Sequence, residues 1–67
     1  MANNWYAVER DADDNDWGTG SYDLDEAKRM AEAMGSEARI AEIEDGNDPI
    51  SVGLYTRDES GAWRWEP

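Results

Sequence analysis

The sequence predicts a small α+β domain, in which one helix packs on one face of a mostly antiparallel sheet of about four strands. Three observations predict this fold class: one amphipathic segment with start and stop signals at residues 23–35, four short segments rich in β-branched or aromatic residues, and turn-forming residues between them. The chain has 67 residues, enough for a single domain, residues 1–67, with a thin hydrophobic core. The expected order of elements is β-α-β-β-β.

The helix is expected between Asp23 and Gly35. Asp23 is a favourable N-cap, and Glu26 three residues later completes a capping-box pattern. Gly35 follows the last apolar residue and can adopt the positive φ that ends many helices. The apolar positions fall on one stripe, as expected for a helix on a core: Leu24, Ala27, Met30, Ala31 and Met34. Two pairs on the polar side have i,i+4 spacing for ion pairing: Asp25–Arg29 and Lys28–Glu32.

Four segments are predicted to be strands: Trp5–Arg10, Glu37–Ile43, Ile50–Thr56 and Ala62–Trp65. In the third segment, alternation would turn Ile50, Val52 and Leu54 toward the helix and Tyr55 toward the other face. Trp63 and Trp65 would share one side of the last strand. Because one helix covers only one face of the sheet, we expect the opposite face to be partly wet or covered by another molecule.

A long acidic loop, residues 11–22, connects the first strand to the helix. Asp11, Asp13 and Asn15 match the start of a calcium-binding loop, but Asp16 replaces its invariant Gly and Tyr22 its final Glu, which excludes an EF-hand. A looser cation site that uses Asp11, Asp13, Asp14 or Asp16 remains an alternative to a solvated loop whose aspartates cap turns. Trp17 is expected to fold onto the core as a lid, and an exposed platform for a ligand is the alternative.

Seventeen Asp and Glu against six Lys and Arg give a formal charge of −11. This charge argues against direct binding to nucleic acid and to anionic membrane surfaces. No apolar run is long enough for a membrane helix and the first residues lack a signal-peptide pattern, so a cytoplasmic location is expected.

The composition also argues against catalysis. The chain has no Cys and no His, which removes thiolate ligands and the commonest general base. No single carboxylate pair stands out as an acid/base couple. We therefore predict no catalytic residue, no cofactor and no enzymatic activity.

Three segments, residues 6–8, 16–27 and 46–50, carry a resemblance that spans nearly the whole chain. In them the sequence resembles a group of short, acidic, uncharacterised bacterial proteins, often carried on mobile genetic elements or phages. The resemblance implies a stand-alone accessory protein in a bacterial cytoplasm. It also favours an inhibitor of nucleic-acid machinery, such as an anti-CRISPR, but it assigns no activity and no catalytic residue.

The leading functional prediction is a non-catalytic module that binds a basic protein surface, as a mimic of nucleic acid. The expected electrostatic contacts are three acidic groups: Asp11, Asp13, Asp14 and Asp16 in the loop; Glu42, Glu44, Asp45 and Asp48 around the second turn; and Asp58 and Glu59 at the last turn. Tyr55 and a Trp on the open face of the sheet are the expected aromatic anchors. One alternative is calcium or other cation binding through the Asp-rich loop 11–16. Another is a homodimer that hides the open sheet face.

Overall fold

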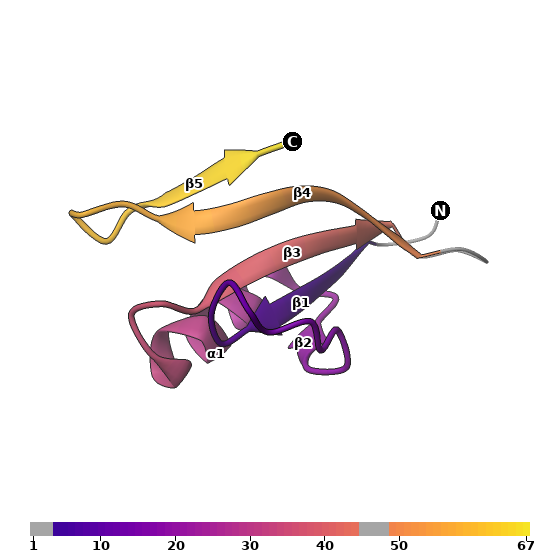
Figure 1. The fold of residues 1–67 in the computed structure, drawn as a ribbon, viewed down its shortest axis with the longest axis horizontal. Helices are drawn as coiled ribbons and strands as arrows, with labels where there is room; N and C mark the ends of the chain where they lie inside the picture. Colours follow the sequence, from indigo (N-terminus) through magenta and orange to yellow (C-terminus); the bar gives the residue numbers. More distant parts are fainter. Residues whose placement is uncertain (1–3, 45–48) are drawn as a thin grey trace.

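The computed structural model describes residues 4–44 and 49–67, which form an α+β domain with one helix on one face of an antiparallel sheet (Figure 1). The elements are β1 (Trp5–Glu9), β2 (Gly20–Ser21), α1 (Leu24–Met34), β3 (Arg39–Glu44), β4 (Ile50–Arg57) and β5 (Trp63–Glu66). Over these residues the sheet has five strands in the order β2-β1-β3-β4-β5, all antiparallel. The predicted fold class is confirmed, and the two-residue strand β2 is an addition to the predicted four.

Helix α1 begins and ends where the sequence predicts. The Asp23 carboxylate accepts a hydrogen bond from the Asp25 amide at 2.9 Å, and the amide of Gly35, at a φ of 151°, donates to the Ala31 carbonyl at 3.2 Å. The capping box does not form, because the Asp23 amide, which Glu26 would bind, donates instead to Ser21 Oγ at 2.9 Å. Strand β2 therefore supplies part of the helix cap. Within the described part of the chain, the helix is neither long nor apolar enough to cross a membrane.

The main core lies between α1 and strands β1 and β3. It is built of small and branched side chains: Val8, Ala27, Ala31, Ala38 and Ile40. The two fully buried alanines of α1 let the helix backbone approach the sheet closely. The helix lies against β1, β2 and β3, so the β4–β5 hairpin extends beyond it (Figure 1).

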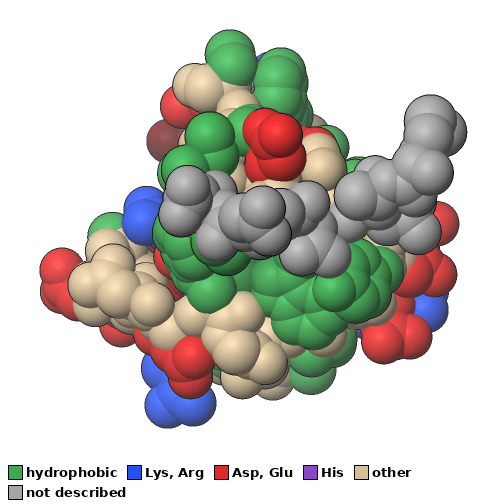
Figure 2. Space-filling model, turned by 90° about the vertical axis from the view of Figure 1, so that its right-hand side faces the viewer, with side chains coloured by type: hydrophobic (Ala, Val, Ile, Leu, Met, Phe, Trp, Pro, Cys, Tyr) green, Lys and Arg blue, Asp and Glu red, His purple; other side chains and the backbone are tan. Residues whose placement is uncertain are grey.

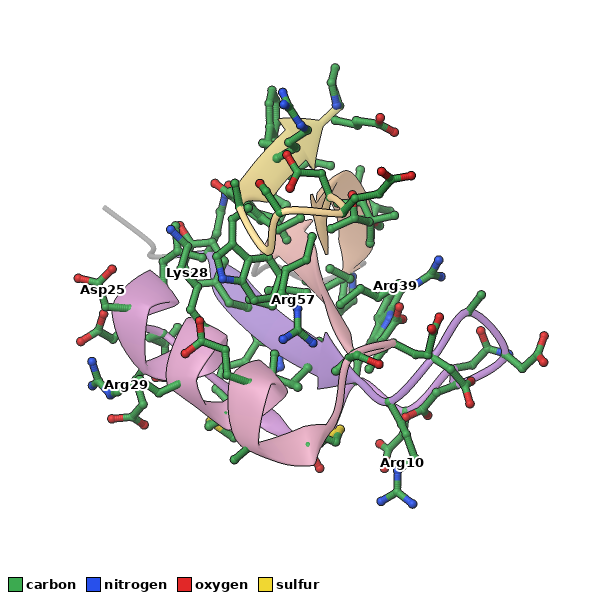
Figure 3. All side chains as sticks on the ribbon, turned by 90° about the vertical axis from the view of Figure 1, so that its left-hand side faces the viewer. Arg10, Asp25, Lys28, Arg29, Arg39 and Arg57 are labelled. Carbon is green, nitrogen blue, oxygen red and sulfur yellow. The ribbon has the colours of Figure 1, made fainter. Side chains whose placement is uncertain are left out.

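The charged side of α1 faces solvent. Among the described residues, two pairs of side chains form ion pairs, Glu9–Arg39 and Asp58–Arg64. The i,i+4 pairs expected on the helix are therefore not formed, and Asp25 and Arg29 project away from it (Figure 3).

The prediction for the two faces of β4 is wrong. Tyr55 is paired with Ile40 and packs on the helix side of the sheet, whereas Leu54 packs on the opposite face against a second buried cluster: Ala7, Ala41 and Ile43. The alternating pattern defines two faces but does not say which one the helix covers. A β-bulge also interrupts the alternation along β4. Glu42 is opposite Gly53 and Ile43 is opposite Ser51, which leaves one extra residue in β4.

Arg57 joins the hairpin to the end of the helix. Its guanidinium donates to the carbonyl of Gly35 and, at 3.3 Å, to that of Ala38. It also lies over the Trp63 ring, 5.1 Å from the centroid. A cation next to the last carbonyls of a helix also complements the helix dipole. Together with Trp63 Nε1, which donates to Glu32 of α1 at 3.5 Å, this side chain anchors the hairpin to the helix.

Replacing Arg57 with lysine is expected to destabilise the protein although the charge is kept. Lysine has no planar group to bridge two carbonyls and stack on an indole. The loss of one hydrogen bond and of the stacking contact should lower the free energy of unfolding by about 1–2 kcal/mol. Urea unfolding measures this, with the exposed Arg10→Lys as the control. Equal stability of the two variants would contradict the anchoring role.

Candidate protein-interaction site

The acidic loop between β1 and β2 folds over the sheet face opposite the helix. The Val8 amide donates to the Thr19 carbonyl at 2.8 Å, and Trp5 Nε1 donates to the Trp17 carbonyl at 2.7 Å. Trp17 Nε1 in turn donates to Glu9 Oε2 at 3.1 Å. Trp17 remains 38% exposed, so it covers this face only in part. The face that was expected to be open is therefore partly covered by the chain itself.

Glu9 is the residue that holds this loop on the sheet, and sequence reasoning missed it. Its side chain is buried, and its second carboxylate oxygen accepts from Arg39 Nε at 2.8 Å. Both oxygens are thus satisfied, as a buried charge requires. The available signal was its place on the same face of β1 as Trp5 and Ala7, at the end of a predicted strand.

The aspartates of the loop cap its own turns. Asp11 Oδ1 accepts from the Asp13 amide at 2.9 Å, and Asp16 Oδ1 from the Gly18 amide at 2.8 Å. Asp14 accepts from two amides, those of Arg10 at 2.9 Å and Asp16 at 3.0 Å, and these bonds lower the pKa of its carboxyl group. These are Asx turns, which fix the loop backbone while the carboxylates stay at the surface.

The geometry offers no support for a cation site in this loop. Over residues 4–44 and 49–67, no three acidic side chains are grouped so that they could hold a metal ion. The carboxylates of Asp11, Asp14 and Asp16 each bind amides of their own turn instead of converging on one point.

The second acidic group lies at the end of β3. Glu44 is exposed, and Glu42 accepts from Asn4 Nδ2 at 2.6 Å. Asp45 and Asp48, which were also predicted as contacts, lie outside the described residues.

Tyr55 belongs to a row of aromatic rings on the helix side of the sheet. Its ring centroid is 6.3 Å from that of Tyr6 and 6.4 Å from that of Trp65. Burial raises the pKa of both tyrosines, and the nearby Glu42 carboxylate raises it further. The predicted position of Tyr55 on the open face is therefore wrong, and its side chain is half-buried in the row.

The third acidic group lies at the β4–β5 turn, where Asp58 has a structural role. Its Oδ1 accepts from the Ser60 amide at 2.9 Å, the Ser60 hydroxyl at 2.6 Å and the Ala62 amide at 3.1 Å. Its Oδ2 accepts from Arg64 Nε at 2.9 Å. These bonds lower the pKa of Asp58 to about 2. Its neighbour Glu59 is exposed.

Asp58 is expected to contribute to stability in a pH-dependent way. Its pKa of about 2 in the folded protein lies below its unfolded value of about 4, so the contribution is present above about pH 4 and is lost as the pH falls toward 2. The difference in unfolding free energy between the natural protein and Asp58→Asn, followed by urea unfolding, should therefore shrink between pH 5 and pH 2. A difference that does not change with pH would contradict this role.

The three acidic groups are spread along the molecule. Glu44 precedes β4, and Asp58 and Glu59 follow it, so about 26 Å of extended strand separates them. The molecule measures 35 Å along its longest axis and 21 by 20 Å across. The second and third groups thus lie at opposite ends of β4, and the described contact residues do not form one compact patch.

An aromatic pocket lies at the end of the molecule where β3 ends and β4 begins, and sequence reasoning missed it. Hydrophobic side chains are visible at this end in Figure 2. Its volume is about 330 Å³, and five described residues line it: Trp5, Trp17, Tyr22, Ile43 and Pro49. The Trp5 and Tyr22 rings meet edge to face, with centroids 4.8 Å apart and an angle of 71° between their planes. The second half of the long loop brings Trp17 and Tyr22 to Trp5, a placement that depends on how the loop folds.

Comparison of the chain with protein-family models, with curated proteins and with solved structures gave no match, so the geometry and charge of this surface carry the functional interpretation.

Proposed function

We propose that this protein is a non-catalytic interaction module that binds a basic protein surface. The observation that carries the proposal is the large excess of acidic side chains that the fold does not neutralise. Within residues 4–44 and 49–67, Glu9 and Asp58 are the carboxylates that form ion pairs with arginine. The formal net charge of −11, which ion pairs within the protein do not change, attracts a cationic partner.

The acidic loop supports this proposal because its charges are held in place. Asx turns fix the backbone around Asp11, Asp14 and Asp16, and Trp5 and Trp17 attach the loop to the sheet. A surface that is already ordered loses little conformational entropy on binding. The fold thus presents fixed anionic groups instead of a flexible acidic tail.

A protein that normally binds nucleic acid is the partner class that fits such a surface. Its basic groove attracts closely spaced phosphates, and binding releases their counterions, so the affinity depends strongly on salt. Fixed carboxylates along a 35 Å molecule offer the same kind of charge to that groove. Together with the resemblance to proteins of mobile elements, this favours a cytoplasmic nucleic-acid mimic that acts as an inhibitor, of the anti-CRISPR kind.

Capture of partners from a bacterial lysate tests the proposal. The immobilised protein is incubated at low salt and then washed with rising salt concentration. We expect it to retain a basic protein, to lose it steeply as salt rises, and to be displaced by duplex DNA. No captured basic protein, or one whose binding ignores salt, would contradict the proposal.

Matched charge variants show whether the acidic groups named above make the contact. The triple variant Asp13→Asn, Glu44→Gln, Glu59→Gln removes three exposed charges from those groups, and Glu26→Gln, Glu37→Gln, Glu66→Gln removes three exposed charges elsewhere. The first variant should weaken binding about tenfold, because each exposed ion pair contributes up to about 1 kcal/mol. The second should weaken it much less. Equal weakening would indicate attraction by net charge alone.

A further inference from the structure

The aromatic pocket offers ring surface and few free polar groups. Both of its indole N–H groups are already hydrogen-bonded to the protein, Trp5 Nε1 to the Trp17 carbonyl and Trp17 Nε1 to Glu9. The edge-to-face contact with Tyr22 holds the third ring against Trp5. The rings are therefore positioned before any ligand arrives, and a ligand would meet π faces and the aliphatic Ile43 and Pro49.

The protein that surrounds this apolar pocket is strongly acidic, with a formal net charge of −11. Asp16 and Asp23 are the chain neighbours of Trp17 and Tyr22, whereas the Glu42 carboxylate lies on the helix side of the sheet, away from the pocket. No Lys or Arg is among the described residues that line the pocket, and the Arg39 guanidinium is held by Glu9. Acidic side chains border the hydrophobic surface at this end of the molecule (Figure 2). The charge around the pocket thus favours a cation, while its walls favour an apolar or planar group.

We propose that the pocket receives an arginine side chain of a partner protein. The guanidinium is planar, weakly hydrated and always charged, so it stacks on indole and phenol rings, where the negative ring faces attract it. Its aliphatic stem can pack on Ile43 and Pro49. The volume of about 330 Å³ lies at the lower end of the range for ligand pockets, which suits one long side chain.

This inference rests on the proposed function for the identity of the partner, but the pocket can be tested without one. The probe is the peptide acetyl-Gly-Arg-Gly-amide, and the control is the same peptide with citrulline, which has nearly the same shape but no charge. Binding is followed by NMR through the indole N–H signals of the four tryptophans.

The arginine peptide should shift the Trp5 and Trp17 signals saturably and leave those of Trp63 and Trp65 unchanged. It should bind at least about fivefold more tightly than the citrulline peptide. Equal binding of the two peptides would overturn the inference, because the pocket would then select shape and not charge. Parallel shifts of all four signals would also overturn it, since they would indicate general attraction to an acidic surface.

Substitution of Tyr22 tests the aromatic contribution. Tyr22 is 53% exposed, and Tyr22→Leu keeps an apolar side chain but removes the ring. The affinity for the arginine peptide should fall about two- to fivefold, the usual contribution of an exposed cation–π contact. Trp65→Leu, which removes an aromatic ring outside the pocket, should leave it unchanged. An unchanged affinity in Tyr22→Leu would contradict the role of the rings.

The two proposals can fail separately. If the natural protein and Tyr22→Leu capture the same basic partner equally well, the protein is an acidic binding module and the pocket inference is wrong. If the arginine peptide occupies the pocket but no basic protein is captured, the pocket inference holds and the proposed function fails.

Discussion

Replacing Ile40 with alanine is expected to remove most of the free energy that keeps the protein folded at 25 °C. Ile40 is fully buried between β3 and the helix, where it packs with Val8, Ala27 and Ala31. Such a substitution costs about 2–5 kcal/mol, because it removes buried methyl groups and leaves a cavity. A domain of this size has a net stability of only about 3–5 kcal/mol. Circular dichroism and urea unfolding measure the loss.

The control for this prediction is Ile50→Ala, the same change at a side chain that is 55% exposed. It should alter the free energy of unfolding by no more than about 0.5 kcal/mol. If the two variants had equal stability, the layer between the helix and the sheet would not be the main source of stability.

Replacing Gly20 with alanine is expected to separate β2 from β1. An added Cβ at this position would overlap the Tyr6 carbonyl oxygen and lie 2.9 Å from the Ala7 Cα. Both are backbone atoms of the neighbouring strand and cannot move without breaking the pairing. We expect a loss of about 1–3 kcal/mol in the free energy of unfolding. Because β2 connects Trp17 to Tyr22, the aromatic pocket should lose its shape as well, which the Trp5 and Trp17 indole signals would report.

Gly53→Ala is the matched control, since it changes a glycine of another strand. Its Cβ would meet the Trp65 indole, at 2.6 Å from Cε2, but that side chain is 47% exposed and can rotate away. The effect on stability should therefore be clearly smaller than at Gly20. A larger loss of unfolding free energy at Gly53 than at Gly20 would contradict this explanation, in which a clash with backbone costs more than a clash with a mobile side chain.

Local signals in the sequence were sufficient to predict the helix. An N-cap, a C-terminal glycine and an apolar stripe all act within a few residues of each other, and each is seen where expected in α1. The strands β1, β3, β4 and β5 were also predicted within two residues at each end, because β-branched and aromatic residues mark them. Strand β2, which was missed, consists of Gly and Ser, and these residues are not typical of strands.

Features that depend on contacts between distant segments were not predicted. The choice of face for Tyr55 and Leu54 depends on where the helix lies and not on β4 itself. The pocket requires Trp5, Trp17 and Tyr22 to meet. The Trp17 carbonyl and Glu9 bind the indole N–H groups of Trp5 and Trp17, and Tyr22 meets Trp5 edge to face. The composition was sufficient to predict that the site is acidic. Which carboxylates cap turns and which are exposed at the surface could be told only from the hydrogen bonds of the folded protein.

The strand order places β2 and β5 at the two edges of the sheet, and this has a consequence for self-association. Open backbone edges invite further strands, which is how many β-rich proteins aggregate. Here one edge is only two residues long, and the other carries Arg64 and Glu66 on a four-residue strand. These two edge strands are therefore poor templates for extending the sheet, whereas residues 50–53 of β4, which β5 does not reach, leave backbone groups open to a further strand among the described residues.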